Sequence, residues 1–151
     1  MNWKYKGKEV TSVRQLPEDV KGFIYMLTFS DGKQYIGRKS FFSIRKKKFG
    51  KKQLANITDK RFKTYETVVT ESDWVNYNSS NKAIKEGLKG GEVTLDSREI
   101  LKLCFSDKQM TYYETQALFC YGVLEHPESF YNDNILGKFF KRDLSREETT
   151  D

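Results

Sequence analysis

Cysteine and long apolar stretches are scarce in this chain of 151 residues. The two cysteines, Cys104 and Cys120, are too few for a disulfide framework, and they do not stand in a CxxC metal-binding pattern. We therefore expect two buried free thiols in a reducing, cytoplasmic environment. No run of about 18 apolar residues is present, which argues against a membrane span. Residues 1–6 also lack the apolar stretch of a secretory signal.

Positive charge is abundant, and it is concentrated in one segment. Between residues 33 and 63 there are 12 lysines and arginines against one acid, Asp59. This segment carries +11 and the rest of the chain −5, because the whole chain carries +6. The cations are Lys33, Arg38, Lys39, Arg45, Lys46, Lys47, Lys48, Lys51, Lys52, Lys60, Arg61 and Lys63. A field this concentrated attracts a polyanion such as the DNA backbone. The alternative is an ordinary solvated lysine-rich loop.

Two short segments with matched tyrosines lie on either side of a turn signal. These are Gly22-Phe23-Ile24-Tyr25 and Tyr35-Ile36-Gly37, separated by Asp31-Gly32. Asp-Gly favours a tight two-residue hairpin turn, so we expect paired strands over 23–29 and 33–37. Side chains alternate along a strand, so Tyr25 should point away from the face that carries Ile24 and Met26. One hairpin would thus bring the phenols of Tyr25 and Tyr35 together, and Arg38-Lys39 would come directly after the second motif.

The length suits a single domain with a core over about 20–140 and an aromatic-rich interior. Strands are expected at 4–6, 9–11 and 93–105, the last one bulged near Asp96. Helices are expected at 41–48 with Ser40 as cap, at 81–89 with Ser79 or Ser80 as cap, and at 109–124. Residues 45–71 are predicted to be a long basic loop, 130–140 to pack back on the domain, and 143–151 to be a polar tail. The predicted fold is α+β, with a three-stranded antiparallel or mixed sheet and flanking helices.

A series of residues, in fixed order from 22 to 132, resembles the GIY-YIG nucleases, in particular the Seg-type endonucleases of phages. The residues are Gly22-x-Ile24-Tyr25, Tyr35-Ile36-Gly37, Arg45, Trp74-x-x-Tyr77 followed by Ser79-Ser80, Glu114 on a helix, and Tyr131-Asn132. The chain departs from the pattern at Phe23, which stands between the first glycine and Ile-Tyr. Where some members have a histidine, the chain offers Tyr77 or Asn78. The only histidine, His126, lies far from that position.

The resemblance implies metal-dependent cleavage of a DNA phosphodiester bond. It assigns Glu114 to a divalent metal, Mg²⁺ or Mn²⁺, and Arg45 to the scissile phosphate, which a guanidinium can grip with two donors. Tyr25 would act as general base or orient the attacking water, and Tyr35 would contact water or phosphate. A free tyrosine has a pKa near 10. Arg38, together with its neighbour Lys39, would therefore have to lower the pKa of Tyr25.

Three supporting roles remain as alternatives. Tyr77 or Asn78 would take the place of the histidine, and Asn132 or Asn134 would support the site by hydrogen bonds. Glu125 and Glu128 are further carboxylates at the exit of the last helix. The residues predicted to bind DNA are Lys39, Lys46, Lys47, Lys48, Lys51, Lys52, Lys60, Arg61 and Lys63. For each of the aromatic and charged residues, the alternative is a purely structural role.

The function we predict is a DNA endonuclease or nickase, for which phage homing or genome competition is one biological role and restriction and repair are alternatives. It would act on DNA in the cytoplasm of a host bacterium, as a monomer or as a dimer. The main alternative is a catalytically inactive nucleic-acid-binding module on the same scaffold. A protein-interaction role is a third alternative, which leaves the basic segment without an explanation.

Overall fold

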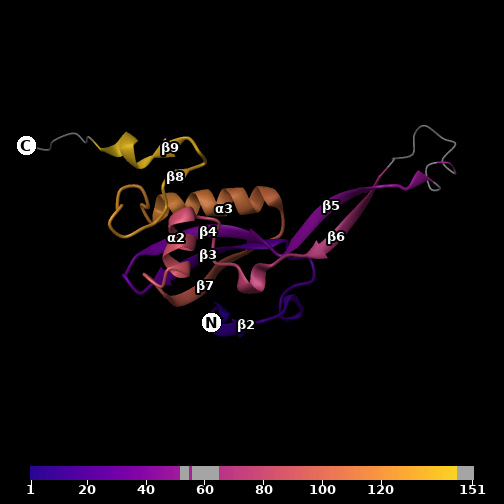
Figure 1. Ribbon diagram of the computed structural model, residues 1–151, viewed down its shortest axis with the longest axis horizontal. Helices are drawn as coiled ribbons and strands as arrows, with labels where there is room; N and C mark the ends of the chain where they lie inside the picture. Colours follow the sequence, from indigo (N-terminus) through magenta and orange to yellow (C-terminus); the bar gives the residue numbers. More distant parts are fainter. Residues whose placement is uncertain (52–54, 56–64, 146–151) are drawn as a thin grey trace, which may run out of the picture.

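The computed structural model describes residues 1–51, 55 and 65–145. Five strands form one mixed sheet in the order β2-β1-β7-β3-β4 (Figure 1). The strands are β1 (Trp3–Tyr5), β2 (Lys8–Val10), β3 (Gly22–Phe29), β4 (Gln34–Ser40) and β7 (Leu95–Cys104). Strands β7, β3 and β4 are antiparallel neighbours, whereas β1 pairs with β7 in parallel. The predicted α+β class with a small mixed sheet is confirmed, and β1 and β2 widen that sheet.

Helices α2 (Lys82–Lys89) and α3 (Asp107–Cys120) cover opposite faces of the sheet. Tyr25 lies with Ile84 of α2 in one core cluster, while Ile24 and Met26 pack against α3 in the other. The predicted alternation along β3 is therefore correct. The remaining elements are η1 (Val13–Gln15), η2 (Trp74–Asn76), η3 (Lys141–Leu144), β8 (Asn134–Ile135) and β9 (Phe139–Phe140). None of the helices in the described part of the chain is long and apolar enough to cross a membrane.

The β3–β4 hairpin confirms the predicted strands but corrects the predicted turn. Its loop has three residues, 30–32, rather than two. The Gly32 N–H donates to the Phe29 carbonyl at 2.9 Å, and the Phe29 N–H donates to the Lys33 carbonyl at 3.0 Å. Gly32 has a φ of +84°, a left-handed conformation that a residue without Cβ adopts easily. The Asp-Gly pair therefore closes the hairpin, with its glycine in the third loop position.

The predicted helix at 41–48 is wrong, and the predicted loop at 45–71 is wrong where residues 45–48 and 65–71 form strands. Strand β5 (Phe42–Lys48) instead pairs in antiparallel fashion with β6 (Tyr65–Glu71), and together they extend away from the sheet (Figure 1). Most side chains on both faces of this ribbon are exposed, so the sequence carries no hydrophobic alternation to reveal it. Five of the seven residues of β6 are valine, threonine or tyrosine, which favour strands. Residues 52–54 and 56–64 lie outside the described residues.

Several predicted boundaries also shift. The side chain of Asn81, rather than Ser79 or Ser80, caps α2 by accepting from the Ile84 N–H at 3.2 Å. Helix α3 ends at Cys120 rather than at Leu124, because Gly122 is left-handed with a φ of +62°. The predicted bulge near Asp96 is confirmed, since the β3–β7 register shifts between Thr28 and Phe29.

The two cysteines differ in their surroundings. Both thiols are free, as predicted, and Cys104 is buried at the end of β7. The prediction that Cys120 is buried is wrong, because it lies on the exposed side of the last turn of α3.

The side chain of Asn132 fixes the segment after α3 to β4. This agrees with the prediction that residues 130–140 pack back on the domain. The amide oxygen of Asn132 accepts from the Ile36 N–H at 3.1 Å, and its amide nitrogen donates to the Ile36 carbonyl at 2.8 Å. Strand β4 is at one edge of the sheet, so the outward N–H and carbonyl of Ile36 need a partner other than a neighbouring strand. Asn132 is 5% exposed, and its side-chain amide is the hydrogen-bond partner of both Ile36 groups. By contrast, Asn134 is exposed and accepts only from the Gly137 N–H.

We expect Asn132→Ala to lower the free energy of unfolding by about 2–4 kcal/mol, because it leaves two backbone groups of the buried Ile36 without partners. The matched variant Asn134→Ala removes one exposed hydrogen bond and should cost about 1 kcal/mol or less. Chemical denaturation of both variants measures the difference. Equal losses would contradict the role given to Asn132.

Candidate active site

A cavity of about 410 Å³ lies along the outer edge of β4. It is lined by Tyr35, Ile36, Arg38, Asn81, Glu114, Leu118, Asn132, Asp133, Asn134 and Leu136. Tyr35 and Arg38 point to opposite faces of the sheet, because they are an odd number of residues apart in one strand. Both can border the same cavity because none of the strands in the described residues pairs with β4 on that side. The cavity thus collects side chains from β4, the start of α2, α3 and the segment after α3.

Three phenols form a cluster behind this cavity. The rings of Tyr25 and Tyr35 have centroids 6.3 Å apart, and Tyr77 meets Tyr25 edge-on at 6.2 Å. Tyr25 pairs across the strands with Gly37, and its ring lies over that glycine. A Cβ at position 37 would lie 2.5 Å from the Tyr25 hydroxyl oxygen, so no other residue fits there without moving the phenol. The glycine of the second motif therefore makes room for the tyrosine of the first.

Burial raises the pKa of Tyr25, and the neighbouring phenols of Tyr35 and Tyr77 raise it further. Burial likewise raises the pKa of Tyr35, and Glu114 adds to that increase. The expectation that Arg38 and Lys39 lower the pKa of Tyr25 is wrong, because both cations face other groups. Burial raises the pKa of the Glu114 carboxyl, and Arg38 offsets part of that increase.

Lys39 does not extend into solvent, although it was predicted to bind DNA. Its ammonium lies 2.6 Å from the Asp73 carboxylate and 4.0 Å from the centroid of the Tyr77 ring. The contact lowers the pKa of Asp73 and places positive charge over the Tyr77 face. Lys39 therefore holds Tyr77 against the phenol cluster.

Ser79 was predicted as a possible helix cap and as part of the Tyr77 motif, without a role in the site. Its side chain faces the hydroxyls of both Tyr25 and Tyr35, and it offsets part of the increase in pKa that burial causes in each. Ser79 is 3% exposed and has a φ of +87°, which is unusual for a residue with a Cβ. Strained, buried backbone of this kind is concentrated at functional sites. Its position beside Tyr77 in the matched motif was the available signal.

Arg98 fixes the backbone that carries Tyr77 and was not anticipated from the sequence. It is 5% exposed, and its guanidinium donates to the carbonyls of Tyr77 and Met1, each at 2.7 Å. It also lies 4.1 Å from the centroid of the Trp3 ring. Burial lowers the pKa of Arg98 to about 10. A buried cation bonded to backbone carbonyls is a costly arrangement, and here it positions the segment 77–79.

Glu114 brings a carboxylate to the cavity from the middle of α3. Burial raises the pKa of Glu114, so its environment disfavours the charged form when no cation is bound. Asp133 borders the same cavity and has Lys141 at 3.7 Å. Among the described residues there is no group of three or more Cys, His, Asp or Glu side chains that could enclose a metal ion.

The oxygen donors around Glu114 are suited to a hard divalent cation that keeps most of its water. Mg²⁺ binds through one or two carboxylates together with substrate phosphate, and needs no complete protein cage. The cavity provides Glu114 with room for such a hydrated ion, and a second carboxylate residue, Asp133, also borders it. The residues present therefore fit a weakly held Mg²⁺ or Mn²⁺.

Other predicted site residues lie elsewhere. Arg45 is on β5 and lines a separate cavity with Lys46, Lys47 and Val68. Glu125 and Glu128 do not border the Glu114 cavity, and Glu128 instead lies 3.6 Å from His126. Lys48 and Lys51 are exposed. The predicted residues Lys52, Lys60, Arg61 and Lys63 lie outside the described residues.

Comparison with protein families identifies the family of the chain. A family model described as "Putative endonuclease segE, GIY-YIG domain" matches residues 3–135. The chain therefore belongs to this GIY-YIG endonuclease family, and the predicted resemblance is confirmed. Searches of curated proteins and of solved structures gave no match.

The raised pKa of Glu114 predicts how stability depends on pH without metal. The stability linked to this group is present below the pKa it has in the unfolded chain, and is lost as pH rises through its higher folded pKa. Ionised Glu114 therefore destabilises the metal-free fold at neutral pH. We expect Glu114→Gln to unfold at a higher denaturant concentration than the wild type at about pH 7, and the difference to disappear at about pH 3, below the usual carboxyl pKa.

The matched control is Glu128→Gln, which changes an exposed carboxylate next to His126. It should leave the unfolding midpoint nearly unchanged. A lower midpoint for Glu114→Gln at neutral pH would mean that attraction by Arg38 outweighs burial.

Proposed function

We propose that the chain is a divalent-metal-dependent DNA endonuclease or nickase that hydrolyses a phosphodiester bond at the Glu114 cavity. One observation carries this proposal: in a chain of the GIY-YIG family, a carboxylate, a phenol and a guanidinium border one cavity at the edge of β4. The residues are Glu114, Tyr35 and Arg38. This is the set of groups needed to hold a cation, orient a water and bind a phosphate.

Glu114 would hold the cation, with water and DNA oxygens completing its coordination. When bound, a divalent cation supplies positive charge next to the phosphate and lowers the pKa of its water. The raised pKa of Glu114 supports this role, because a carboxylate that is destabilised alone gains from a nearby cation. Mg²⁺ and Mn²⁺ both suit an oxygen site of this type.

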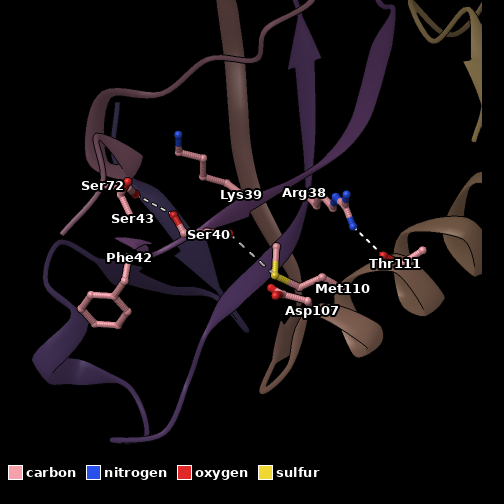
Figure 2. Close-up of a pocket in the computed structure, with 9 residues that line it drawn as sticks. All are labelled: Arg38, Lys39, Ser40, Phe42, Ser43, Ser72, Asp107, Met110 and Thr111. Atoms are coloured by element: carbon pink, nitrogen blue, oxygen red, sulfur yellow. Dashed lines mark hydrogen bonds between the residues drawn. The ribbon is translucent and has the colours of Figure 1, made fainter. Parts of the chain in front are cut away.

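Arg38 would bind the scissile phosphate, the role that the family resemblance gives to Arg45. Its guanidinium is held from α3 by a 2.7 Å hydrogen bond to the Thr111 hydroxyl (Figure 2). Arg38 is exposed and borders the Glu114 cavity, so its remaining donors can face a phosphate. We assign Arg45 to DNA binding away from the reacting atoms, because it lies on the extended ribbon.

Tyr35 would orient the attacking water, since it is the phenol that borders the cavity. Tyr25 is 1% exposed and lies behind it, so Tyr25 would position Tyr35 together with Ser79. A phenol with a raised pKa stays protonated near neutral pH. In this proposal, both tyrosines therefore act mainly as hydrogen-bond partners until positive charge is added to the site.

Tyr77 would fill the position of the absent histidine, because its ring contacts Tyr25 and is held by Lys39. Asn132 would support the site through β4, in preference to the exposed Asn134. The resemblance also implies a role in phage homing or genome competition in the cytoplasm of a host. In that role, the biological outcome would be a strand break in the genome of a competing phage.

Cleavage of supercoiled plasmid and genomic DNA tests the proposal. With Mg²⁺ or Mn²⁺ we expect nicked or linear products, and none with EDTA. Glu114→Gln should lose more than the roughly 10–100-fold that removal of an outer-shell partner costs, since Glu114 itself would contact the cation. Glu128→Gln should cleave at the wild-type rate.

Use of genomic DNA as well as plasmid reduces the chance that a rare target sequence is missing. Salt-sensitive DNA binding without cleavage in either metal would instead support the inactive binding module. Equal cleavage by Glu114→Gln and wild type would show that the reaction takes place elsewhere.

A further inference from the structure

The ribbon made by β5 and β6, which we call the arm, has two distinct faces. Its pairing register aligns Ile44 with Val69, Arg45 with Val68, and Lys47 with Glu66. Side chains alternate along each strand. One face therefore carries Ser43, Arg45, Lys47, Glu66, Val68 and Thr70, and we call it the Arg45 face. The other carries Ile44, Lys46, Lys48, Tyr65, Thr67 and Val69, and we call it the Lys46 face.

The base of the arm is firmly attached to the core. Phe41, between β4 and β5, is fully buried, with its ring centroid 4.8 Å from that of Phe23 and 5.0 Å from that of Trp74. The returning chain is fixed at Ser72, whose N–H donates to the Phe41 carbonyl at 2.8 Å. The Ser72 hydroxyl also donates to the Ser40 carbonyl at 2.6 Å. The arm therefore leaves the sheet in a defined direction.

On one side, the base of the arm borders a cavity of about 620 Å³ that is rich in hydroxyl groups (Figure 2). Its lining includes Ser43 of the Arg45 face, together with Ser72 and Thr111. Arg38 also lines this cavity, and it lines the Glu114 cavity as well. Serine and threonine hydroxyls and arginine are common ligands of DNA phosphates. A continuous polar path thus runs from the Glu114 cavity, past Arg38, to the Arg45 face.

At the base of the arm, the Lys46 face borders a different cavity from the one beside the Arg45 face. Ile44 and Val69 border a smaller cavity there, which is lined by the carboxylates Glu18 and Asp19 and by one cation, Lys21. The two carboxylates together repel phosphate more than Lys21 attracts it. Asp107 borders the cavities on both sides, so it does not distinguish them. Each face carries two cations, and Lys46 lies 4.7 Å from the centroid of the Tyr65 ring. The Arg45 face also carries Glu66, so charge alone would favour the Lys46 face. The choice of the Arg45 face therefore rests on what its base borders.

We propose that the Arg45 face of the arm binds duplex DNA next to the cleavage site, with Arg38 as the link between the two. This inference rests on the proposed function, because it takes the Glu114 cavity as the place of the scissile phosphate. A two-stranded ribbon is one of the few elements that fits the major groove of DNA. An isolated ribbon is marginally stable in water, so bound DNA would also stabilise the arm.

Site-directed cross-linking tests which face meets DNA. Ser43→Cys and Ile44→Cys are made in a Cys120→Ser background, which leaves only the buried Cys104. Each is labelled with a photoactivatable maleimide and mixed with linear duplex DNA in EDTA, so that no cleavage is needed. We expect several-fold more cross-linked DNA from position 43 than from position 44. Equal or reversed yields would overturn the proposal.

Salt dependence gives a second measurement with matched variants. We expect the double variant Arg45→Ala/Lys47→Ala to reduce the slope of log affinity against log salt by about 2, since each lost phosphate contact contributes roughly 0.9. Lys46→Ala/Lys48→Ala, with the same loss of charge, should reduce it by less than about 1. A larger loss from the second variant would contradict the proposal.

The two proposals fail in different ways. If the wild type cleaves DNA but both double variants bind it equally well, the Arg45 face is not the DNA contact and the nuclease assignment stands. If the wild type cross-links from position 43 but never cleaves, the arm binds DNA on a scaffold without nuclease activity. Unfolding midpoints of all variants should match that of the wild type, because the altered side chains are exposed.

Discussion

The packing of Tyr25 across Gly37 is the contact on which the rest of the site depends. The buried Tyr25 ring lies over Gly37 of β4. Because Gly37 has no Cβ, it leaves the space that the ring needs. This contact also fixes the register of the β3–β4 hairpin, because a slip by one residue would move every side chain to the other face. Tyr35 and Ser79 then meet the Tyr25 hydroxyl from two sides. The two glycine-tyrosine motifs are therefore one structural unit.

The position of β4 at the edge of the sheet explains how distant parts of the chain reach one cavity. An edge strand exposes both of its faces and its outward backbone groups. Asn132 satisfies the backbone of Ile36, while Arg38 and Tyr35 extend from opposite faces toward Glu114. Burial raises the pKa values of Tyr25, Tyr35 and Glu114, so the site holds ionisable groups in surroundings that disfavour their charge. Such clusters occur more often at functional sites than in structural cores.

The elements that were predicted correctly carry a strong local signal. The Asp-Gly turn between two matched tyrosine segments identified the hairpin, and the helical position of Glu114 was correct because α3 packs on the sheet. The arm was missed since both of its faces meet solvent, which removes the periodic signal. Arg98 was missed because its role depends on carbonyls far away in the chain. Ser79 was named in the motif, but its contact with the phenols was not anticipated because it depends on a left-handed backbone. Arg45 was assigned by order along the chain, but its place in space follows from pairing with β6.

The central claim is that the Tyr25 hydroxyl serves chemistry rather than packing. Tyr25→Phe removes that oxygen and keeps the ring against Trp3, Phe23 and Tyr35. The most direct measurement is therefore the single-turnover rate of DNA cleavage by this variant, together with its unfolding midpoint. The account predicts an unfolding midpoint at or above that of the wild type and a cleavage rate reduced by roughly 10²-fold, typical for loss of one positioned catalytic hydrogen bond. Wild-type cleavage by Tyr25→Phe would contradict it.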